Sequence, residues 1–392
     1  MTPLTITHYT LTNALGRGRE ASLQALRNDH SGLRPCDLPN VDLETWIGRV
    51  NGLEEMAFNT GLETFDCRNN RLACLALQQD DFLPAVERAK QDYGADRIGL
   101  FLGTSTSGIA TTETAYLERT DDRLPPDYAP ADTHNIFSAN SFVRRFLGLA
   151  GPSLAISTAC SSSAKVFAAA HRYIETGICD AALVGGIDSL CLTTLYGFTA
   201  LDLVSAQTCR PWDRARNGIN IGEAAGFALL QRPRDNLSAP SLLGYGESSD
   251  AYHMSTPHPQ GDGALSAMQQ ALQRAGLEPG EIDYINLHGT ATRSNDASED
   301  RAVYRLFGRQ PACSSTKGFT GHTLGASGIT ESIFSLLCLE DGLLPCNLQT
   351  RQTDPNLQAN IVLQRQHRPI SRVLSNSFGF GGNNCSLIFG EA

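Results

Sequence analysis

The alternation of short apolar runs with amphipathic segments constrains the fold of this chain more than any other feature. Residues 97–104 and 153–159 are continuous, mostly apolar runs bounded by turn residues, which predicts buried strands. Residues 163–177 follow the second run with apolar side chains at helical spacing, and Gly177 is placed to end that helix. Residues 180–187 supply a further buried strand. Strands that alternate with helices in this way predict a layered α/β fold.

The second part of the chain repeats this pattern. Apolar residues at helical spacing in 265–275 predict a helix that ends at Gly276, and residues 282–288 follow as a strand. Residues 314–342 again run from strand to loop to helix, and residues 372–389 are typical of a closing hairpin. We therefore expect two similar halves.

The length of the chain supports the same division. A chain of 392 residues is longer than one hydrophobic core usually organises. The segment 231–240 is polar and contains proline, which is typical of a boundary between domains. We expect an N-terminal half at residues 1–238 and a C-terminal half at 239–392.

Composition excludes several classes of protein. Hydrophobic residues make up 41% of the chain and charged residues 18%, as in an ordinary globular enzyme. The first residues lack a basic region followed by an apolar run, and no apolar stretch is long enough to span a bilayer, so we expect a cytoplasmic protein without membrane insertion. A net charge of −10 argues against nucleic-acid binding. Eleven cysteines without a CxxC or Cys/His cluster argue against a disulfide framework and against a metal site.

One cysteine has a placement that suggests reactivity. Cys160 lies in Ser157-Thr-Ala-Cys-Ser-Ser-Ser163, between a predicted strand and the start of a predicted helix. Unpaired N–H groups and the helix dipole favour a thiolate there and lower the pKa from about 8.5 towards neutrality. A free cysteine is more often a buried structural residue, so the interpretation depends on the neighbours of Cys160.

Two further segments carry residues suited to catalysis. His288 stands at a predicted strand end before a glycine, where functional groups of α/β sheets collect. Lys317 and His322 lie in a glycine-rich loop that opens a helix. Each histidine alone is as easily a structural hydrogen-bonding residue, but together with Cys160 they predict a nucleophilic site.

A third segment is rich in glycine near the end of the chain. Residues 376–384 read Asn-Ser-Phe-Gly-Phe-Gly-Gly-Asn-Asn, in which glycines allow backbone N–H groups to approach a ligand closely. A tight hairpin turn is the alternative interpretation. That alternative does not explain Phe378 and Phe380 inside the turn.

With these residues in place, the chain resembles the β-ketoacyl-acyl carrier protein synthases of the thiolase superfamily, in the branch with one cysteine and two histidines. The landmarks follow the family's order over nearly the whole chain, at 158–160, 210–218, 249–254, 288–290, 316–322 and 377–382. The resemblance implies a thiolase-like fold, in which two similar α/β halves form a layered α-β-α-β-α architecture. The chain departs from the family pattern at Arg293, Asn383 and Cys385, where proline, threonine and glycine are common.

The resemblance also implies roles for the residues singled out. Cys160 would attack the thioester of an acyl carrier protein, and the backbone N–H groups of Cys160 and Phe380 would form the oxyanion hole. His288 and His322 would hold the carbonyl of a malonyl thioester while CO2 leaves. Lys317 would orient or polarise His322.

Supporting roles follow from the same resemblance. Glu299 would anchor the His288 loop as a buried ion-pair partner, and Phe378 and Phe380 would gate the site. The product would be a 3-oxoacyl group on the carrier, in fatty-acid or type II polyketide biosynthesis. Ser161-Ser-Ser163 is similar to ketosynthases of aryl-polyene clusters. No cofactor is expected, since the substrates ride on the phosphopantetheine of the carrier protein.

The expected partners are an acyl carrier protein and a second subunit. Arg68 and Arg71 lie where the family has a basic docking helix, with Arg214 and Arg216 as the second choice. The second subunit would be either another copy or a paralogue that resembles a chain-length factor. The buried strand at 180–187 and the resemblance indicate a dimer built around the sheet of the first half, with one continuous sheet across the two subunits.

Two alternatives remain at this stage. A catalytically silent chain-length factor has the same fold but normally lacks the nucleophile, whereas Cys160 is present here. A degradative thiolase uses a second cysteine as acid and base, and Cys385 is the candidate near the final strand.

Overall fold

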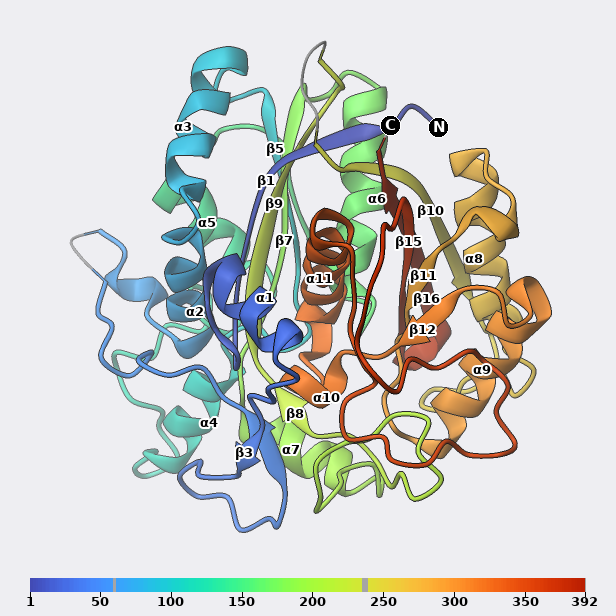
Figure 1. Cartoon of the computed structure of the whole chain (residues 1–392). Coiled ribbons are helices and arrows are strands. Elements are labelled where there is room, and N and C mark those ends of the chain that lie inside the picture. The colour runs from blue at the N-terminus through green and yellow to red at the C-terminus, as the bar shows by residue number, and fades with distance from the viewer. Residues whose placement is uncertain (59–60, 235–238, 392) are drawn as a thin grey trace.

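The first half of the chain builds one half of a central sheet. The computed structural model describes residues 1–58, 61–234 and 239–391, shown in Figure 1. The strand order is β6 (Ser153–Ile156), β5 (Ile98–Gly103), β7 (Ala181–Asp188), β9 (Ala224–Gln231) and β1 (Leu4–Asn13). Strand β5 runs parallel to β6 and β7, whereas β9 is antiparallel to both β7 and β1.

The second half repeats this order and these directions. Its strands are β12 (Ala312–Ser314), β11 (Tyr284–Asn286), β15 (Arg372–Gly379), β16 (Asn383–Gly390) and β10 (Ser241–Ser249). Strand β11 is parallel to β12 and β15, whereas β16 is antiparallel to β15 and β10. The expected duplication and the closing hairpin are therefore confirmed. The two half-sheets join where β1 pairs with β10.

Helices form three layers around the two half-sheets. Helices α6 (Ser162–Glu175) and α11 (Ser327–Asp341) pack against each other between the half-sheets, as Figure 1 shows. The outer layer beside the first half-sheet contains α2 (Arg68–Leu77), α3 (Phe82–Tyr93) and α5 (Ser138–Leu147). The outer layer beside the second contains α8 (Asp262–Ala275) and α9 (Arg293–Phe307). This is the α-β-α-β-α architecture that the resemblance implied.

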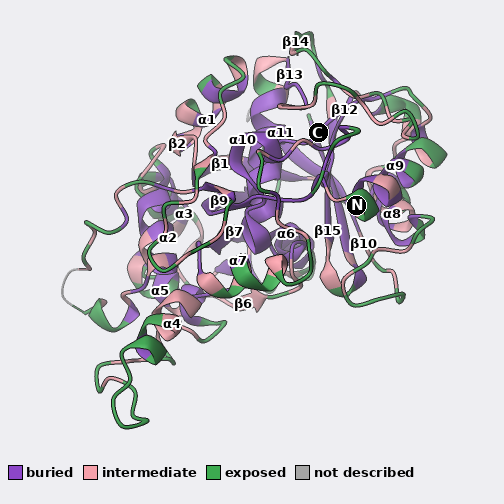
Figure 2. Cartoon of the chain, turned by 90° about the horizontal axis from the view of Figure 1, so that it is seen from below, coloured by how far each residue is buried: buried purple, intermediate pink, exposed green. Residues whose placement is uncertain are grey.

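The two central helices are buried on nearly every side. Helix α11 is buried from Ser327 to Cys338, and α6 is buried except at a few positions (Figure 2). A helix that is apolar all round belongs between layers rather than on a surface. Because both helices start from the same end of the molecule, the residues before them are brought together there.

The remaining elements are short and lie in the connections. They are the helices α1 (Gly18–Arg27), α4 (Ile109–Leu117), α7 (Leu192–Thr199) and α10 (Lys317–Thr320), and the strands β2 (Gly16–Arg17), β3 (Arg34–Pro35), β4 (Trp46–Gly48), β8 (Ile221–Gly222), β13 (Leu343–Leu344) and β14 (Gln366–His367). Across the described part of the chain, no helix combines the length and apolarity needed to cross a membrane.

Two expectations concern how the chain and its dimer are organised. The division into 1–238 and 239–392 stays a prediction, since residues 235–238 at the seam lie outside the described residues. The expected dimer around the sheet of the first half also stays a prediction, but the strand at 180–187 cannot itself pair across the subunits. Strand β7 is paired on one side by β5 and on the other by β9, so it has no free edge. The open edge of this half-sheet is β6.

Candidate active site

Cys160 is placed by a tight turn between β6 and α6. Ala159 adopts φ of 52°, a left-handed conformation that costs a residue with a side chain about 1 kcal/mol. The turn closes when the Thr158 N–H donates to Ser162 Oγ at 2.9 Å. Cys160 therefore stands just before the helix, as the sequence predicted, and only 6% of its surface is exposed.

The glycine-rich turn approaches Cys160 from the other half of the molecule. A Cβ atom on Gly379 would stand 2.9 Å from the Thr158 oxygen and 3.1 Å from the Cys160 nitrogen, so only glycine fits there. This close approach aims the N–H of Phe380, the next residue, at the Cys160 sulfur. The segment is also a hairpin turn, as the alternative interpretation predicted, and the approach of its N–H groups to a ligand stays a prediction.

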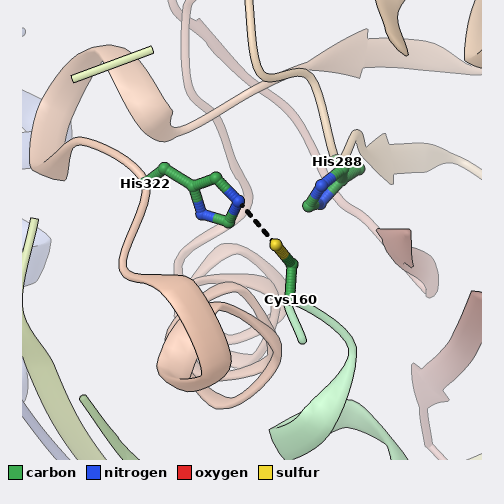
Figure 3. A group of neighbouring side chains, drawn as sticks. All are labelled: Cys160, His288 and His322. Atoms are coloured by element: carbon green, nitrogen blue, oxygen red, sulfur yellow. Dashed lines mark hydrogen bonds between the residues drawn. The ribbon is translucent and has the colours of Figure 1, made fainter. Parts of the chain in front are cut away.

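His322 lies beside the sulfur. Its Nε2 is 3.1 Å from Cys160 Sγ, the contact drawn in Figure 3. The backbone N–H of Leu324 donates to His322 Nδ1 at 3.3 Å. Because Nδ1 accepts this bond, the neutral ring carries its hydrogen on Nε2 and presents an N–H donor to the pocket.

His288 faces the same point from the end of β11. Its ring lies 5.3 Å from the His322 ring, centroid to centroid, at an interplanar angle of 82° (Figure 3). The Lys317 ammonium is 3.5 Å from His288 Nδ1 and also donates to the His288 carbonyl oxygen. An ammonium has only donors, so Nδ1 is again the acceptor and Nε2 carries the hydrogen.

Lys317 has a different neighbour from the one expected. The prediction was that it orients or polarises His322. Its side chain contacts His288 instead, so His322 is not oriented by direct contact, whereas the Lys317 charge does act on His322. Lys317 is 1% exposed and forms an ion pair with Glu331, which is also buried. A buried ammonium requires such a partner. The sequence analysis missed Glu331, although it is the one charged residue of α11 before the helix's last turn, which signals a buried partner.

Glu299 anchors the His288 loop without an ion pair. Its carboxylate accepts the N–H groups of His288 and Gly289, each at 2.8 Å, and the Asn376 amide at 3.1 Å. The expected anchoring contact is present, but these three donors are neutral, and Glu299 has no ion-pair partner within the described ranges of the chain. Burial raises the pKa of Glu299 to about 7.

Burial dominates the protonation of the three central groups. Burial and the Lys317 charge hold the pKa of His288 and of His322 well below the ordinary value, so both rings are neutral. Burial also raises the pKa of the Cys160 thiol to about 12, while the Lys317 charge and the Phe380 N–H act in the opposite direction. The expectation of a lowered cysteine pKa is therefore wrong for the closed pocket, since enclosure outweighs the helix start.

The same three side chains meet the spacing of a metal site. Their donor atoms lie within 4.8 Å of one another. A metal ion would need the Nε2 lone pairs, yet both Nδ1 atoms are already acceptors and direct the hydrogens to Nε2. The Lys317 ammonium would also repel a cation. The arrangement suits a carbonyl oxygen or an anion better than a metal ion.

A small cavity encloses these groups. It measures about 60 Å³ and is lined by Cys160, His288, His322 and Phe378 together with other residues. This volume holds a few water molecules but not an acyl chain. The Phe380 ring also lines the cavity and lies 5.4 Å from the ring of Phe198, another lining residue. Phe378 and Phe380 therefore occupy positions from which they can control access.

The arginines expected at a docking surface are not equivalent. Arg216 is 3% exposed and contacts Asp296 at 3.3 Å and Asp354 at 2.8 Å, so its assignment to docking is wrong because it lies inside the protein. Arg214 is exposed, and its side chain contacts the Gln352 amide at 3.4 Å.

The first-choice pair is already engaged by carboxylates. Arg68 contacts the buried Glu223 at 2.5 Å and Glu54 at 2.6 Å, and its side chain is only 16% exposed. Arg71 pairs with Asp66 at 2.5 Å. These carboxylates compensate the positive charge, so the expected basic patch does not form from Arg68 and Arg71.

The chemistry that this geometry can perform follows from its donors. The Phe380 N–H lies at the sulfur, where a backbone donor can stabilise an oxyanion. The two imidazole Nε2–H groups are further donors in the same cavity, within 4.8 Å of the sulfur and of each other. The site can therefore form a thioester on the cysteine while it polarises the carbonyl of another molecule.

Comparisons with known proteins agree with this chemistry. Residues 1–236 match the family model "Beta-ketoacyl synthase, N-terminal domain", and residues 240–351 match "Beta-ketoacyl synthase, C-terminal domain". The chain is 31% identical to 3-oxoacyl-[acyl-carrier-protein] synthase 2 of Vibrio cholerae, with 98% of each chain covered. It is 34% identical to the Staphylococcus aureus protein of the same name, over 78% of this chain and 80% of that one.

A solved structure extends the comparison to three dimensions. A chain from the complex of the ketosynthase ApeO with its chain length factor ApeC, from Xenorhabdus doucetiae, superposes with a TM-score of 0.90. The two chains are 39% identical, and the match covers 100% of this chain and 98% of the other.

Proposed function

The chain belongs to the β-ketoacyl synthase family of acyltransferases, and from this premise we propose that it condenses an acyl group with a malonyl-derived unit, both delivered by acyl carrier protein. The observation that carries the proposal is one contact: Cys160 Sγ lies 3.1 Å from His322 Nε2, in a cavity that His288 also lines. The cysteine that takes the acyl group and the two histidine donors that act on the malonyl unit then lie in a single site.

In the first half-reaction, Cys160 takes the acyl group. Its sulfur attacks the thioester carbonyl, and the N–H groups of Cys160 and Phe380 stabilise the tetrahedral oxyanion. The bond to the phosphopantetheine sulfur breaks, and the thiol proton leaves with the departing carrier. No further cofactor is needed for this transfer.

In the second half-reaction, the malonyl thioester loses CO2. The Nε2–H groups of His288 and His322 stabilise the enolate oxygen, so a carbanion equivalent forms without a strong base. Its carbon attacks the Cys160 thioester and expels the sulfur. The product is a 3-oxoacyl group on the second carrier, and Lys317 and Glu299 support His288 throughout.

The pathway is fatty-acid or type II polyketide biosynthesis in the cytoplasm. The synthases of Vibrio and Staphylococcus support the use of a carrier protein, as their names state. The similarity to the ketosynthase and chain-length-factor complex supports a pathway in which the two kinds of subunit work together. Ser161-Ser-Ser163 after the nucleophile is the feature that favours an aryl-polyene type of pathway. The second subunit is then another copy or a chain-length-factor-like paralogue.

Neither alternative function is favoured. A silent chain-length factor does not need a complete set of Cys160, His288 and His322 around one cavity. A degradative thiolase needs a second cysteine at the site. Cys385 is buried within β16, and Cys160 is the one cysteine among the described residues that line the cavity.

Covalent labelling tests the proposal. After incubation with an acyl-carrier thioester, mass spectrometry should locate the added acyl mass on Cys160, because no other cysteine lines this cavity among the described residues. A label on Cys385 or Cys67 with Cys160 free would exclude the mechanism. The acyl group that labels most rapidly identifies the preferred starter.

The edge strand β6 predicts the subunit contact. The carbonyl groups of Pro152 and Ile156 accept hydrogen bonds from β5, so the alternate residues Ser153 and Ala155 direct their backbone groups to the open edge. Ala155→Pro removes one outward N–H and should shift the dimer to monomer in sedimentation velocity. Ala155→Val keeps that N–H and should remain dimeric. A stable, active monomer of the parental protein would contradict the proposed pairing.

We propose Arg214 as a residue that binds the acyl carrier protein. It is the exposed member of the four arginines and contacts no carboxylate among the described residues. An acidic carrier is repelled by the net charge of −10, so a local cation at short range is required.

A further inference from the structure

One side chain connects the nucleophile's helix to the turn that carries Phe380. Lys165 lies in the opening turns of α6, and its ammonium donates to Asn383 Oδ1 at 3.2 Å. Asn383 begins β16, directly after the turn. The next cation along this face of α6, Arg172, is paired with Glu247 at 2.6 Å instead. Lys165 has no role in the condensation described above.

The helix side of this contact is fixed. Ser162 Oγ accepts the Thr158 N–H at 2.9 Å, and Ser163 Oγ accepts the Ile329 N–H of α11 at 2.9 Å. These bonds hold the start of α6 to the strand before it and to the neighbouring central helix. Lys165 therefore extends from a rigid base.

The turn side is more adaptable. Gly381 and Gly382 adopt φ of 76° and 71°, so two consecutive residues lack side chains that would limit the backbone. The Gly381 N–H donates to the Met254 oxygen at 2.7 Å, and the Gly382 oxygen accepts the Asp250 N–H at 2.9 Å. These bonds hold the tip of the turn to the segment 250–254, and Gly379 packs against Cys160 at its base. Lys165 adds a side-chain contact between α6 and the residue that follows the turn.

We propose that Lys165 is a positioning residue, whose bond to Asn383 holds the turn at the distance from α6 that aims the Phe380 N–H at the Cys160 sulfur. The inference rests on the proposed function, because this N–H matters only if an oxyanion forms at Cys160.

The proposal makes the two half-reactions respond differently. Acyl transfer uses the oxyanion donors, whereas decarboxylation of malonyl carrier uses the two imidazole donors. A misplacement of about 1 Å can cost a catalytic group up to about 100-fold. Loss of the Lys165 contact should therefore slow acyl transfer and leave decarboxylation almost unchanged.

Lys165→Met tests this, because it removes the ammonium and keeps most of the length. We expect the rate of Cys160 acylation, followed by mass spectrometry, to fall about tenfold. Release of CO2 from malonyl carrier should stay within about twofold of the parental rate, since it does not use the Phe380 N–H. Lys165→Arg keeps a donor and should restore most of the acylation rate.

Two further variants separate positioning from a loss of structure. Asn383→Ala should reproduce the acylation defect, and the double variant should be no slower than either single one, as expected for two residues that act through one contact. Arg172→Met, on the same face of α6, should leave both rates unchanged.

Three results would overturn the proposal. They are an unchanged acylation rate in Lys165→Met, equal losses in both half-reactions, and multiplicative losses in the double variant. Failure of the proposed function itself would be recognised separately, because the parental protein would then carry no acyl group on Cys160.

Discussion

Cys160→Ala should abolish condensation while CO2 release from malonyl carrier continues. The variant removes the atom that holds the acyl group, so no thioester is available for the enolate to attack. We expect a loss of at least about 10⁴-fold in 3-oxoacyl product. The imidazole donors of His288 and His322 remain, and decarboxylation should persist within about tenfold. Parallel assays of product and of CO2 measure the two effects.

A matched control for this variant is Cys36→Ala. Cys36 is half-buried and lies outside the cavity, so its replacement should leave both activities at the parental level. Condensation by Cys160→Ala at even a few per cent of the parental rate would require another nucleophile. Loss of decarboxylation together with condensation would instead mean that the cysteine is needed for malonyl binding.

His288→Ala should have the opposite effect. It removes one of the two N–H donors at the enolate oxygen, and deletion of such a donor costs about 10²- to 10³-fold. Acylation of Cys160 should remain within about threefold of the parental rate, because the Cys160 and Phe380 N–H groups are untouched. Single-turnover acylation and CO2 release, measured on the same preparation, separate the two steps.

The control for the histidine variant is His367→Ala. His367 lies exposed on β14, so both rates should be unchanged. If His288→Ala released CO2 at the parental rate, the enolate would have to be stabilised by other groups. If the variant lost acylation as well, the Lys317 ammonium left without its histidine partner would be the first suspect.

Local patterns predicted the fold well. Buried strands such as β5 and β7 are short apolar runs, and α6 has apolar residues at helical spacing, so each element is visible within its own sequence. The repeated order of strands and helices was sufficient to predict two halves. The edge position of β6 was not predicted, because strand order depends on pairings between distant segments.

The sequence predicted which residues form the site but not which of them contact one another. Cys160, His288 and His322 stand at strand and loop ends that the sequence marks, whereas the partner of Lys317 depends on how α10 and α11 meet. Arg216 was misplaced for the same reason, since its burial is decided by Asp296 and Asp354. The pKa of the Cys160 thiol is raised because both halves of the chain bury it. No local motif encodes that burial.

The central position of β1 has a consequence for biosynthesis of the chain. This strand is made long before its main partners, since β9 spans Ala224–Gln231 and β10 follows later still. At ribosomal speeds of about 5 to 20 residues per second, β1 waits roughly 10 to 40 s for them, paired only at its last two residues with β2. Contacts of such large sequence separation form slowly, and an apolar strand exposed for that time is a target for chaperones and for aggregation. The yield of native protein should therefore depend on translation speed and chaperone supply more than on the final stability of the sheet.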